Sequence, residues 1–287
     1  MSSPPGGTAD RPRRAVVADL HTHTDRSDGR LSPRDLVARA ADRGLRVLAV
    51  TDHDTVAGLA PAREAAEEAG LRFVDGVELS VSLEGEELHL LAYAVDPTHE
   101  SLRRHLEEMQ EARRARAWTI VDRLRDEGLE VEDEELRTTI ASTAAVGRPH
   151  VAAALVRAGY VETSHEAFDR YLGAGGPGFV PKPDFPAGDA LAVVHEAGGV
   201  GVLAHPGHWT STAQLRALVA AGLDGLELYH PSHGPSLQHY YRRVARSYDL
   251  VVTGGSDYHG RTEEEANRLG DMGLDEDEWE RFRAALA

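Results

Sequence analysis

The chain has 287 residues, with 31 Lys and Arg against 48 Asp and Glu, so its formal net charge is −17. This charge opposes non-specific attraction to a long polyphosphate backbone, which argues against long duplex nucleic acid as a partner. Cysteine is absent, which excludes disulfides, thiolate metal sites and a cysteine nucleophile. Any metal must therefore be held by imidazole, carboxylate or water, and the sequence offers 15 His for this purpose.

The opening segment, residues 1–14, is rich in Pro, Gly and Arg and predicts a disordered tail. It lacks the apolar core of a signal peptide, and no later run approaches the roughly 20 apolar residues of a membrane span. The sequence therefore predicts a cytoplasmic protein without a membrane partner. No pattern indicates the oligomeric state.

After the tail, short apolar runs alternate with amphipathic stretches. The first apolar run, 15–20, predicts a buried strand, and the next, 46–50, predicts a second. Between them Ser32 can cap a helix that begins at Pro33, and Gly44 suits its C-terminal end. The same alternation predicts further strands at 71–77, 87–95, 200–204, 225–229 and 250–254, and further helices at 57–69, 187–197, 211–221 and 236–247.

This alternation predicts an α/β fold with parallel strands joined by right-handed crossovers. Polar clusters follow many of the strands at their carboxyl ends, which favours a closed barrel with its functional site at that end. A doubly wound open sheet is the alternative architecture.

The segment 98–180 breaks the alternation and shows no strand pattern. We expect it to form a helical insertion domain between two barrel strands, where it could roof the site and contribute substrate contacts. The barrel domain then consists of 15–97 and 181–287. Within the insertion, helices are expected at 99–127, 133–141, 148–158 and 164–172.

Histidines and carboxylates gather where the predicted strands end. His21 and His23 follow the first strand, and alternate residues of an extended segment share a face, so both can reach one ion. A turn brings Asp28 back toward them. Alone, a His-x-His pair fits surface histidines equally well. The ends of later strands add the side chains of His53, Glu78, His205, Asp257 and His259.

His89 lies inside the predicted strand 87–95 rather than at its end. A buried, hydrogen-bonded core histidine is one interpretation, and a ligand that lines the barrel is the other. Five strand ends that deliver His, Asp or Glu to one rim are hard to explain as solvated loops. The pattern therefore predicts a metal site, with His89 beside it.

The segments that carry these residues resemble the PHP (polymerase and histidinol phosphatase) family. They read HTH…SDG, TDHDT, GVE, HLLAY, LAHPG and SDYHG, and they follow one another in the family's order. The resemblance implies a distorted (β/α)7 TIM-like barrel and a trinuclear cluster of manganese, zinc or iron.

Carried onto this sequence, the resemblance gives each ion its own ligands, with Glu78 as a bridge between two of them. In many relatives a histidine stands in place of Asp28. The groups nearest the chemistry are then Asp28, His53, His205, Asp257 and His259. The three implied ligand sets are His21, His23, Glu78 and Asp257; Asp28, His53 and His259; and Glu78, His89 and His205.

Within the family, GRPH at 147–150 and Pro-Lys-Pro at 181–183 resemble a subgroup of small phosphoesterases. That subgroup includes nucleoside 3′,5′-bisphosphate phosphatases and RNA or oligonucleotide 5′-to-3′ exonucleases. Arg148 could offer a bidentate fork to a phosphate, although Arg148 and His150 also suit an ordinary helix start. The side chains predicted to bind substrate are Arg148, His150, Lys182, Tyr93 and His230.

The resulting hypothesis is a metal-dependent phosphoesterase that uses two or three divalent ions (Mn, Fe or Zn) to activate water. Its predicted substrates are small phosphate monoesters, first among them AMP-type nucleoside 3′,5′-bisphosphates. The alternatives are a 5′-to-3′ exonuclease on short RNA, a histidinol-phosphate phosphatase, and a non-catalytic metal-binding scaffold module.

Overall fold

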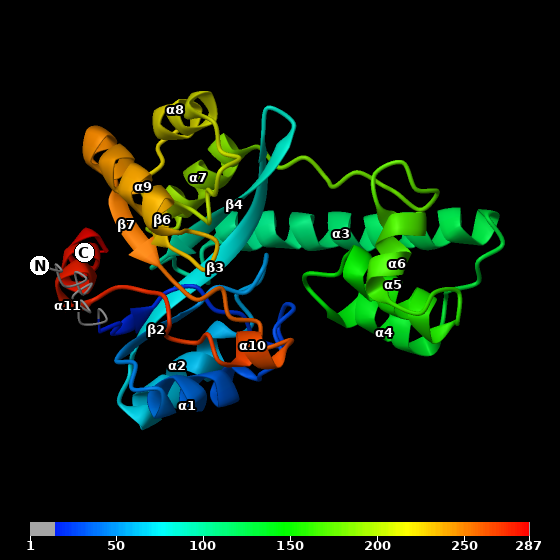
Figure 1. Ribbon diagram of the computed structural model, residues 1–287, viewed down its shortest axis with the longest axis horizontal. Coiled ribbons are helices and arrows are strands. Elements are labelled where there is room, and N and C mark those ends of the chain that lie inside the picture. Colours follow the sequence, from blue (N-terminus) through cyan, green and yellow to red (C-terminus); the bar gives the residue numbers. More distant parts are fainter. Residues whose placement is uncertain (1–14, 287) are drawn as a thin grey trace, which may run out of the picture.

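A computed structural model describes residues 15–286, so the predicted tail at 1–14 lies outside the described residues. Within these residues, seven strands form one sheet whose order in space follows their order in the chain (Figure 1). The strands are β1 (Ala18–Asp19), β2 (Val47–Val50), β3 (Arg72–Leu83), β4 (Glu86–Tyr93), β5 (Val200–Leu203), β6 (Gly225–Tyr229) and β7 (Val251–Gly254).

The two outer strands of this sheet approach each other and nearly close it into a barrel. The backbone N–H of Leu20, just after β1, donates to the carbonyl of Gly254 at 3.1 Å. Farther along, the N–H of His23 donates to the carbonyl of Tyr258 at 2.9 Å. The predicted α/β barrel is therefore confirmed, and the open doubly wound sheet is excluded.

One strand runs against the others, which the sequence did not predict. β4 pairs antiparallel with β3 and with β5, whereas the remaining neighbours pair parallel. β3 continues to Leu83, beyond the predicted end at residue 77, and turns directly into β4. Glu84 and Gly85 form this turn with φ of 54° and 83°, as a tight hairpin of left-handed residues requires. With no helix between the two strands, a parallel crossover cannot form.

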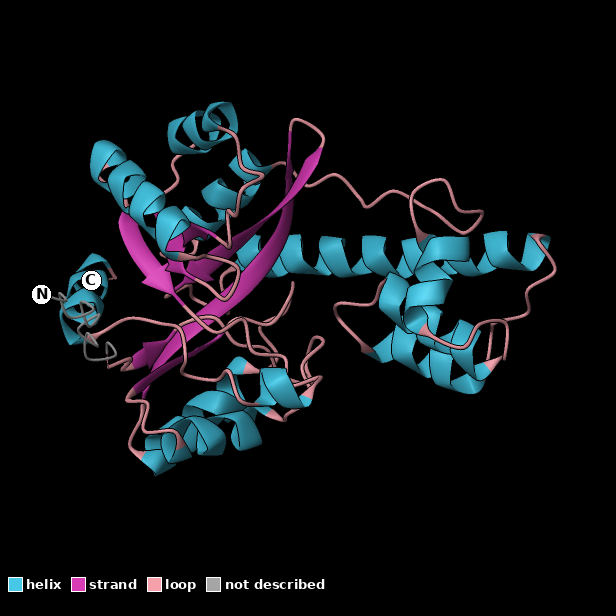
Figure 2. Ribbon diagram, in the orientation of Figure 1, coloured by secondary structure: helices cyan, strands magenta, loops and turns pink. Residues whose placement is uncertain are grey.

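Helices cover the outside of the barrel (Figure 2). In the first of them, the Ser32 hydroxyl accepts a hydrogen bond from the Asp35 N–H at 3.2 Å, and Pro33 occupies the first turn, as predicted. These helices are α1 (Pro33–Asp42), α2 (Leu59–Ala69), α7 (Ala187–Glu196), α8 (Thr212–Ala220), α9 (Pro235–Tyr248), α10 (Glu263–Ala266) and α11 (Glu276–Ala285).

The chain between β4 and α7 forms a helical lobe that extends away from the barrel (Figure 1). Its longest helix, α3, buries Leu106 and Met109 in the barrel core and Ile120 and Leu124 in a second apolar cluster of the lobe. One rigid helix thus belongs to both cores. That the lobe is a domain bounded by residues 98–180 stays a prediction. Its elements are α3 (Glu100–Asp126), α4 (Glu134–Ser142), α5 (Arg148–Arg157), α6 (Ser164–Ala167) and the π-helix η1 (Phe168–Leu172).

Within residues 15–286, no helix combines the length and apolar character that crossing a membrane requires. The cytoplasmic location stays a prediction from the sequence.

The barrel closure generates a first prediction, at Gly255. A Cβ atom there would lie 2.3 Å from His21 Cβ and 2.4 Å from His21 N, so β1 and the end of β7 could not keep their present spacing. Gly255→Ala should lower the free energy of unfolding by about 1–3 kcal/mol in a urea titration, because overpacking forces the backbone apart.

Gly188→Ala is the matched control, because its added Cβ would meet only the Ala221 Cβ, at 3.8 Å, and it lies within helix α7. It should leave stability unchanged or raise it by roughly 0.5–1 kcal/mol. Equal stability of the two variants would contradict a tight closure at Gly255.

Candidate metal centre

The Glu78 carboxylate lies at the centre of the site, buried at the rim end of the barrel interior. Five imidazoles surround its two oxygen atoms. Oε2 lies 3.2 Å from His21 Nε2, 3.1 Å from His23 Nε2 and 3.2 Å from His53 Nδ1. Oε1 lies 2.8 Å from His89 Nδ1 and 3.0 Å from His205 Nε2. A single carboxylate therefore faces two groups of imidazoles, one on each oxygen.

Two further carboxylates flank this arrangement. Asp257 Oδ1 lies 3.3 Å from His23 Nε2 and 3.4 Å from His21 Nε2. Asp28 Oδ1 lies 3.2 Å from His259 Nε2. The structure thus brings all nine side chains that the sequence proposed as metal ligands into one cluster.

The donor atoms of this cluster fall into overlapping groups in which all atoms lie within 4.8 Å of one another. The overlap occurs at His23, His53 and Glu78, so these three could contribute to more than one ion. How the ligands divide among ions stays a prediction. The groups are His23, Asp28, His53 and His259; His21, His23 and Glu78; and His53, Glu78 and His89.

Several buried nitrogens of the cluster have no hydrogen-bond partner. Both ring nitrogens of His23 and Nδ1 of His53 are in this position, since their contacts with the carboxylates lack hydrogen-bond geometry. A buried polar group left unpaired costs about 1–3 kcal/mol, so such atoms are expected only where a further partner binds. Imidazole with carboxylate is a donor set that suits Mn, Fe and Zn. The residues present therefore fit divalent cations.

The pKa shifts within the cluster also favour the binding of divalent cations. Burial alone would raise the pKa of Glu78, but the surrounding imidazoles hold it well below its usual range. Burial lowers the pKa of His53 to about 3. For His23 and His89, burial is outweighed by neighbouring carboxylates, which raise their pKa values to about 10 and about 9. These two imidazoles hold protons in the metal-free protein, and cations would displace them.

A carboxylate that the sequence analysis missed supports the cluster from behind. Glu227, fully buried on β6, accepts a hydrogen bond from His21 Nδ1 at 3.0 Å and one from the His205 backbone N–H at 2.7 Å. With Nδ1–H donated to Glu227, His21 directs Nε2 toward Glu78, so Nε2 is the nitrogen that can bind a cation once its proton leaves. The available signal was an acidic residue in the middle of the apolar strand 225–229, where a solvated side chain is not expected.

Two other acids beside the ligands hold loops rather than imidazoles. Asp19 accepts the backbone N–H groups of Ser256 and Gly270, each at 2.9 Å, and burial raises its pKa to about 6. Asp52 accepts from the backbone and the hydroxyl of Thr24 at 2.7 and 2.6 Å. Both carboxylates therefore fix the backbone of segments that carry ligands.

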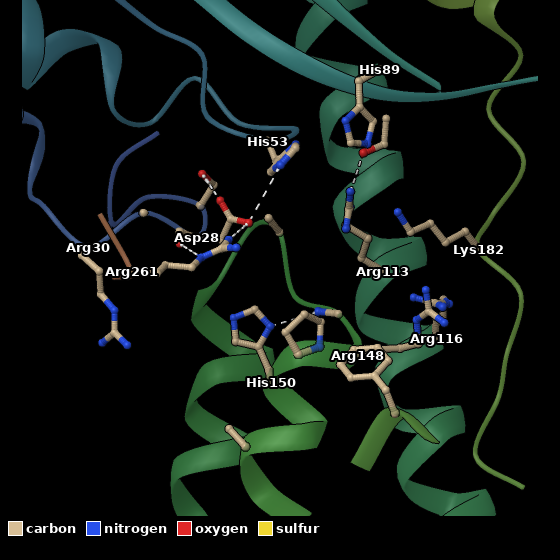
Figure 3. Close-up of a pocket in the computed structure, with 18 residues that line it drawn as sticks. Asp28, Arg30, His53, His89, Arg113, Arg116, Arg148, His150, Lys182 and Arg261 are labelled. Carbon is tan, nitrogen blue, oxygen red and sulfur yellow. Dashed lines mark hydrogen bonds and ion pairs between the residues drawn. The ribbon is translucent and has the colours of Figure 1, made fainter. Parts of the chain in front are cut away.

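A cavity of about 620 Å³ opens beside the cluster, reached by Asp28, His53 and His89 (Figure 3). Asp28 is the one acid among the described residues that line it. Six cationic side chains line the same space, namely Arg30, Arg113, Arg116, Arg148, Lys182 and Arg261. A strongly acidic chain therefore carries a basic cavity next to its candidate metal ligands.

Three of the five predicted substrate-binding residues line this cavity: Arg148, His150 and Lys182. The Arg148 guanidinium lies over two aromatic rings, 5.5 Å from the centroid of Phe168 and 5.9 Å from that of Phe179. Lys182 forms an ion pair with Glu87 on β4. Their contact with a substrate stays a prediction.

His150 is oriented by the start of its own helix. Its Nδ1 accepts the backbone N–H of Gly147 at 3.2 Å, so the proton of the neutral ring is on Nε2. Burial lowers the pKa of His150, which favours that neutral form. The ring therefore offers an N–H donor to the cavity (Figure 3).

The prediction that Tyr93 contacts substrate is wrong. Its side chain is fully buried, and its hydroxyl donates to the carbonyl of Leu20 at 2.8 Å. Because β4 runs antiparallel, residues after His89 lead away from the rim, and Tyr93 pairs with Gly76 below Glu78. His230 does not line the cavity either; its Nε2 lies 3.3 Å from Asp257 Oδ2, and its role toward substrate stays a prediction.

Four cavity cations were not identified from the sequence. Arg113, on α3, donates to Asp54 Oδ2 at 2.7 Å and to Ser80 Oγ at 2.6 Å. Arg116 donates to the carbonyl of Val180. The other two are Arg30 and Arg261, and Arg261 pairs with the Asp28 carboxylate. In sequence, the arginines of α3 look like an ordinary solvated helix face, so no local signal marks them.

Comparison with known proteins supports this geometry. The model of the PHP domain family matches residues 19–178. The chain belongs to the PHP domain family. The resemblance drawn from the sequence motifs is therefore confirmed.

PHP-domain relatives cover most of this chain. The 5′-3′ exoribonuclease Rnm of Escherichia coli is 36% identical over 85% of this chain and 86% of its own length. The phosphoribosyl 1,2-cyclic phosphate 1,2-diphosphodiesterase of Eggerthella lenta is 36% identical over 86% and 95%. The 3′,5′-nucleoside bisphosphate phosphatase of Chromobacterium violaceum is 34% identical over 84% and 86%.

A solved structure of a candidate metal-dependent phosphoesterase from Bifidobacterium adolescentis has a TM-score of 0.81 and 37% identity to this chain. The match covers 92% of this chain and 94% of that chain. Family, fold and relatives agree that this PHP-domain protein is an enzyme, a metal-dependent phosphoric ester hydrolase.

The buried carboxylate behind His21 generates a prediction about metal affinity. Glu227→Gln should weaken metal binding by roughly 10- to 100-fold, because an amide cannot accept both hydrogen bonds as a carboxylate does. A competition titration against a chromophoric chelator measures this. Asp224→Asn is the matched control. Asp224 also accepts hydrogen bonds from an imidazole and a backbone N–H, those of His195 and Gly201, but it lies away from the cluster. Equal affinity in both variants would contradict the positioning role.

The unpaired nitrogens and the protonated imidazoles predict how metal affects stability. Removing metal with a chelator should lower the melting temperature by roughly 5–10 °C, if the metal was present near 100 times its dissociation constant. The shift should be larger at about pH 8 than at about pH 6.5, because protons on His23 and His89 must leave before cations bind. Thermal unfolding with and without chelator, followed by Mn²⁺ addition, measures both effects; an unchanged melting temperature would count against the metal centre.

Proposed function

We propose that this enzyme hydrolyses phosphate monoesters of nucleotides that carry a second phosphate, with AMP-type nucleoside 3′,5′-bisphosphates as its first substrates. The observation that carries the proposal is the cavity of about 620 Å³, which has candidate metal ligands at one end and cations on its other walls. We propose two or three divalent ions, Mn, Fe or Zn, on the ligands implied by the family.

The charges of the cavity favour two phosphates over one. Even after Arg261 pairs with Asp28, Lys182 with Glu87 and Arg113 with Asp54, three of the six cations remain, which exceeds the two charges of one phosphate dianion. A volume of about 620 Å³ falls within the roughly 300–1,000 Å³ of small-molecule sites. Ala145, Pro149 and Phe168 add apolar wall for a base or ribose.

Hydrolysis forms a bond from water oxygen to phosphorus and breaks the ester P–O bond, and the leaving oxygen takes up a proton. Divalent ions held by the cluster would lower the pKa of water and offset charge on the phosphate. Arg148, whose guanidinium lies over two aromatic rings, and Lys182 bind the phosphate that does not react. His150 donates its Nε2–H to a substrate oxygen. These groups orient the ester without touching the ligand cluster.

A second candidate is 5′-to-3′ exonuclease action on short RNA, which the similarity to Rnm supports over 85% of this chain. Histidinol phosphate fits less well, because its ammonium group would enter a cavity whose walls carry six cations and one acid. The non-catalytic scaffold hypothesis is excluded by the family and its named relatives.

The proposed phosphate anchors predict a substrate-dependent loss. Arg148→Ala and Lys182→Ala should retain metal yet lose about 10- to 150-fold in kcat/KM on adenosine 3′,5′-bisphosphate, the usual effect of one lost charge-assisted hydrogen bond. The loss on a simple aryl phosphate should be distinctly smaller, since it has no second phosphate. Phosphate release by the metal-loaded enzyme measures both.

Arg103→Ala is the control for removal of an arginine, because Arg103 lies exposed on α3, outside the cavity, and forms an ion pair with the exposed Glu107. It should keep wild-type rates on both substrates. Equal losses on the bisphosphate and the aryl phosphate would assign Arg148 and Lys182 to the reacting group instead. Undetectable hydrolysis of the bisphosphate by wild-type enzyme would overturn the proposed function itself.

A further inference from the structure

A second cavity, of about 340 Å³, adjoins the first on the side away from Asp28. It lies between the β3–β4 hairpin and the segment 179–184, which leads from the helical lobe back to the barrel. The family resemblance and the proposed function assign it no role.

The two cavities share a wall of four side chains, those of Ser80, Arg116, Arg148 and Lys182. Figure 3 shows Arg116, Arg148 and Lys182 together, on the side of the first cavity opposite Asp28. A phosphate anchored by these cations therefore stands at the boundary between the two spaces. A group attached to that phosphate would leave the first cavity through this boundary.

The lining of the second cavity differs from that of the first. Beyond the shared cations it presents three carboxylates, those of Glu86, Glu87 and Asp184, together with flat apolar faces from Phe179 and two prolines. A further phosphate or sulfate would meet like charge there. An uncharged organic group would instead gain apolar contact and find carboxylate acceptors for its N–H or O–H groups.

Arg148 links the two spaces directly. Phe168 lines only the first cavity and Phe179 only the second, and both rings contact the same guanidinium, at 5.5 and 5.9 Å from their centroids. Because Arg148 lines both cavities and contacts a ring of each, a phosphate bound to it lies where the two cavities meet.

We propose, on the basis of the function argued above, that the second cavity binds an uncharged group joined to the phosphate or diphosphate that the shared cations anchor. The enzyme then accepts nucleotides whose reacting phosphate is a monoester and whose other phosphate continues into a neutral chain. The bond that breaks stays the monoester P–O bond, and the products are inorganic phosphate and the dephosphorylated, extended nucleotide.

Coenzyme A is a suitable probe, because it is an adenosine 3′-phosphate whose 5′-diphosphate can lie against the three cations shared by the two cavities while its uncharged arm enters the second cavity. With metal-loaded wild-type enzyme, kcat/KM for phosphate release from coenzyme A should fall within about tenfold of that for adenosine 3′,5′-bisphosphate. Dissociation constants from calorimetry at low temperature give a readout independent of turnover.

Two variants separate the cavities. Phe179→Leu and Phe168→Leu each remove one ring from the Arg148 guanidinium. Both substitutions should therefore weaken binding of the bisphosphate to a similar degree. Only Phe179→Leu should change the ratio of kcat/KM for coenzyme A to kcat/KM for the bisphosphate. It should lower this ratio by about 5- to 30-fold, because of the two rings only Phe179 lines the second cavity.

Coenzyme A turned over more than about 100-fold less efficiently than the bisphosphate would overturn the inference while leaving the proposed function intact. So would an unchanged substrate ratio in Phe179→Leu. Absence of turnover of both coenzyme A and the bisphosphate would overturn the proposed function. The ratio of their dissociation constants, compared between wild type and Phe179→Leu, would still decide whether the second cavity binds the uncharged arm.

Discussion

The carboxylate of Glu78, buried among five imidazoles, is the interaction on which the rest of the site depends. A buried anion is costly unless positive charge compensates it, and here the compensation comes from protonated imidazoles or from metal ions. The imidazoles arrive from four segments, since His21 and His23 share the loop after β1 and the other three come from β4 and from the loops after β2 and β5. The barrel must therefore close in one register for the carboxylate to be neutralised, and Glu227 and Asp19 hold the surrounding segments in that register.

Local charge and net charge oppose each other in this molecule. The chain carries −17 overall, yet the cavity beside the ligands holds six cations. The helical lobe supplies several of them, and α3 positions them because it is packed into both apolar cores. Arg113 fixes this helix to the barrel through Asp54, the residue next to His53. The helix that presents cations to a substrate is thus anchored beside the candidate metal ligands.

The reversed strand β4 has consequences for chemistry as well as for topology. Because the β3–β4 hairpin extends past the rim, Ser80 and Glu87 stand above the ligand cluster and meet Arg113 and Lys182. The same reversal places His89 next to Glu78 although it lies in mid-strand. An all-parallel barrel would have a helix in place of this hairpin and could not form the wall that the two cavities share.

The sequence by itself determined the barrel class, the strand positions and the nine side chains that converge at the rim, because alternating apolar runs and polar strand ends are local patterns. It could not determine the direction of β4, the burial of Tyr93 or the support from Glu227, since each depends on which strands become neighbours. The arginines of α3 were also beyond it: Arg113 and Arg116 differ from solvated helix residues only through contacts with Asp54 and Val180, which are distant in sequence. Tertiary structure decided these features because it sets which distant charges share one low-dielectric space.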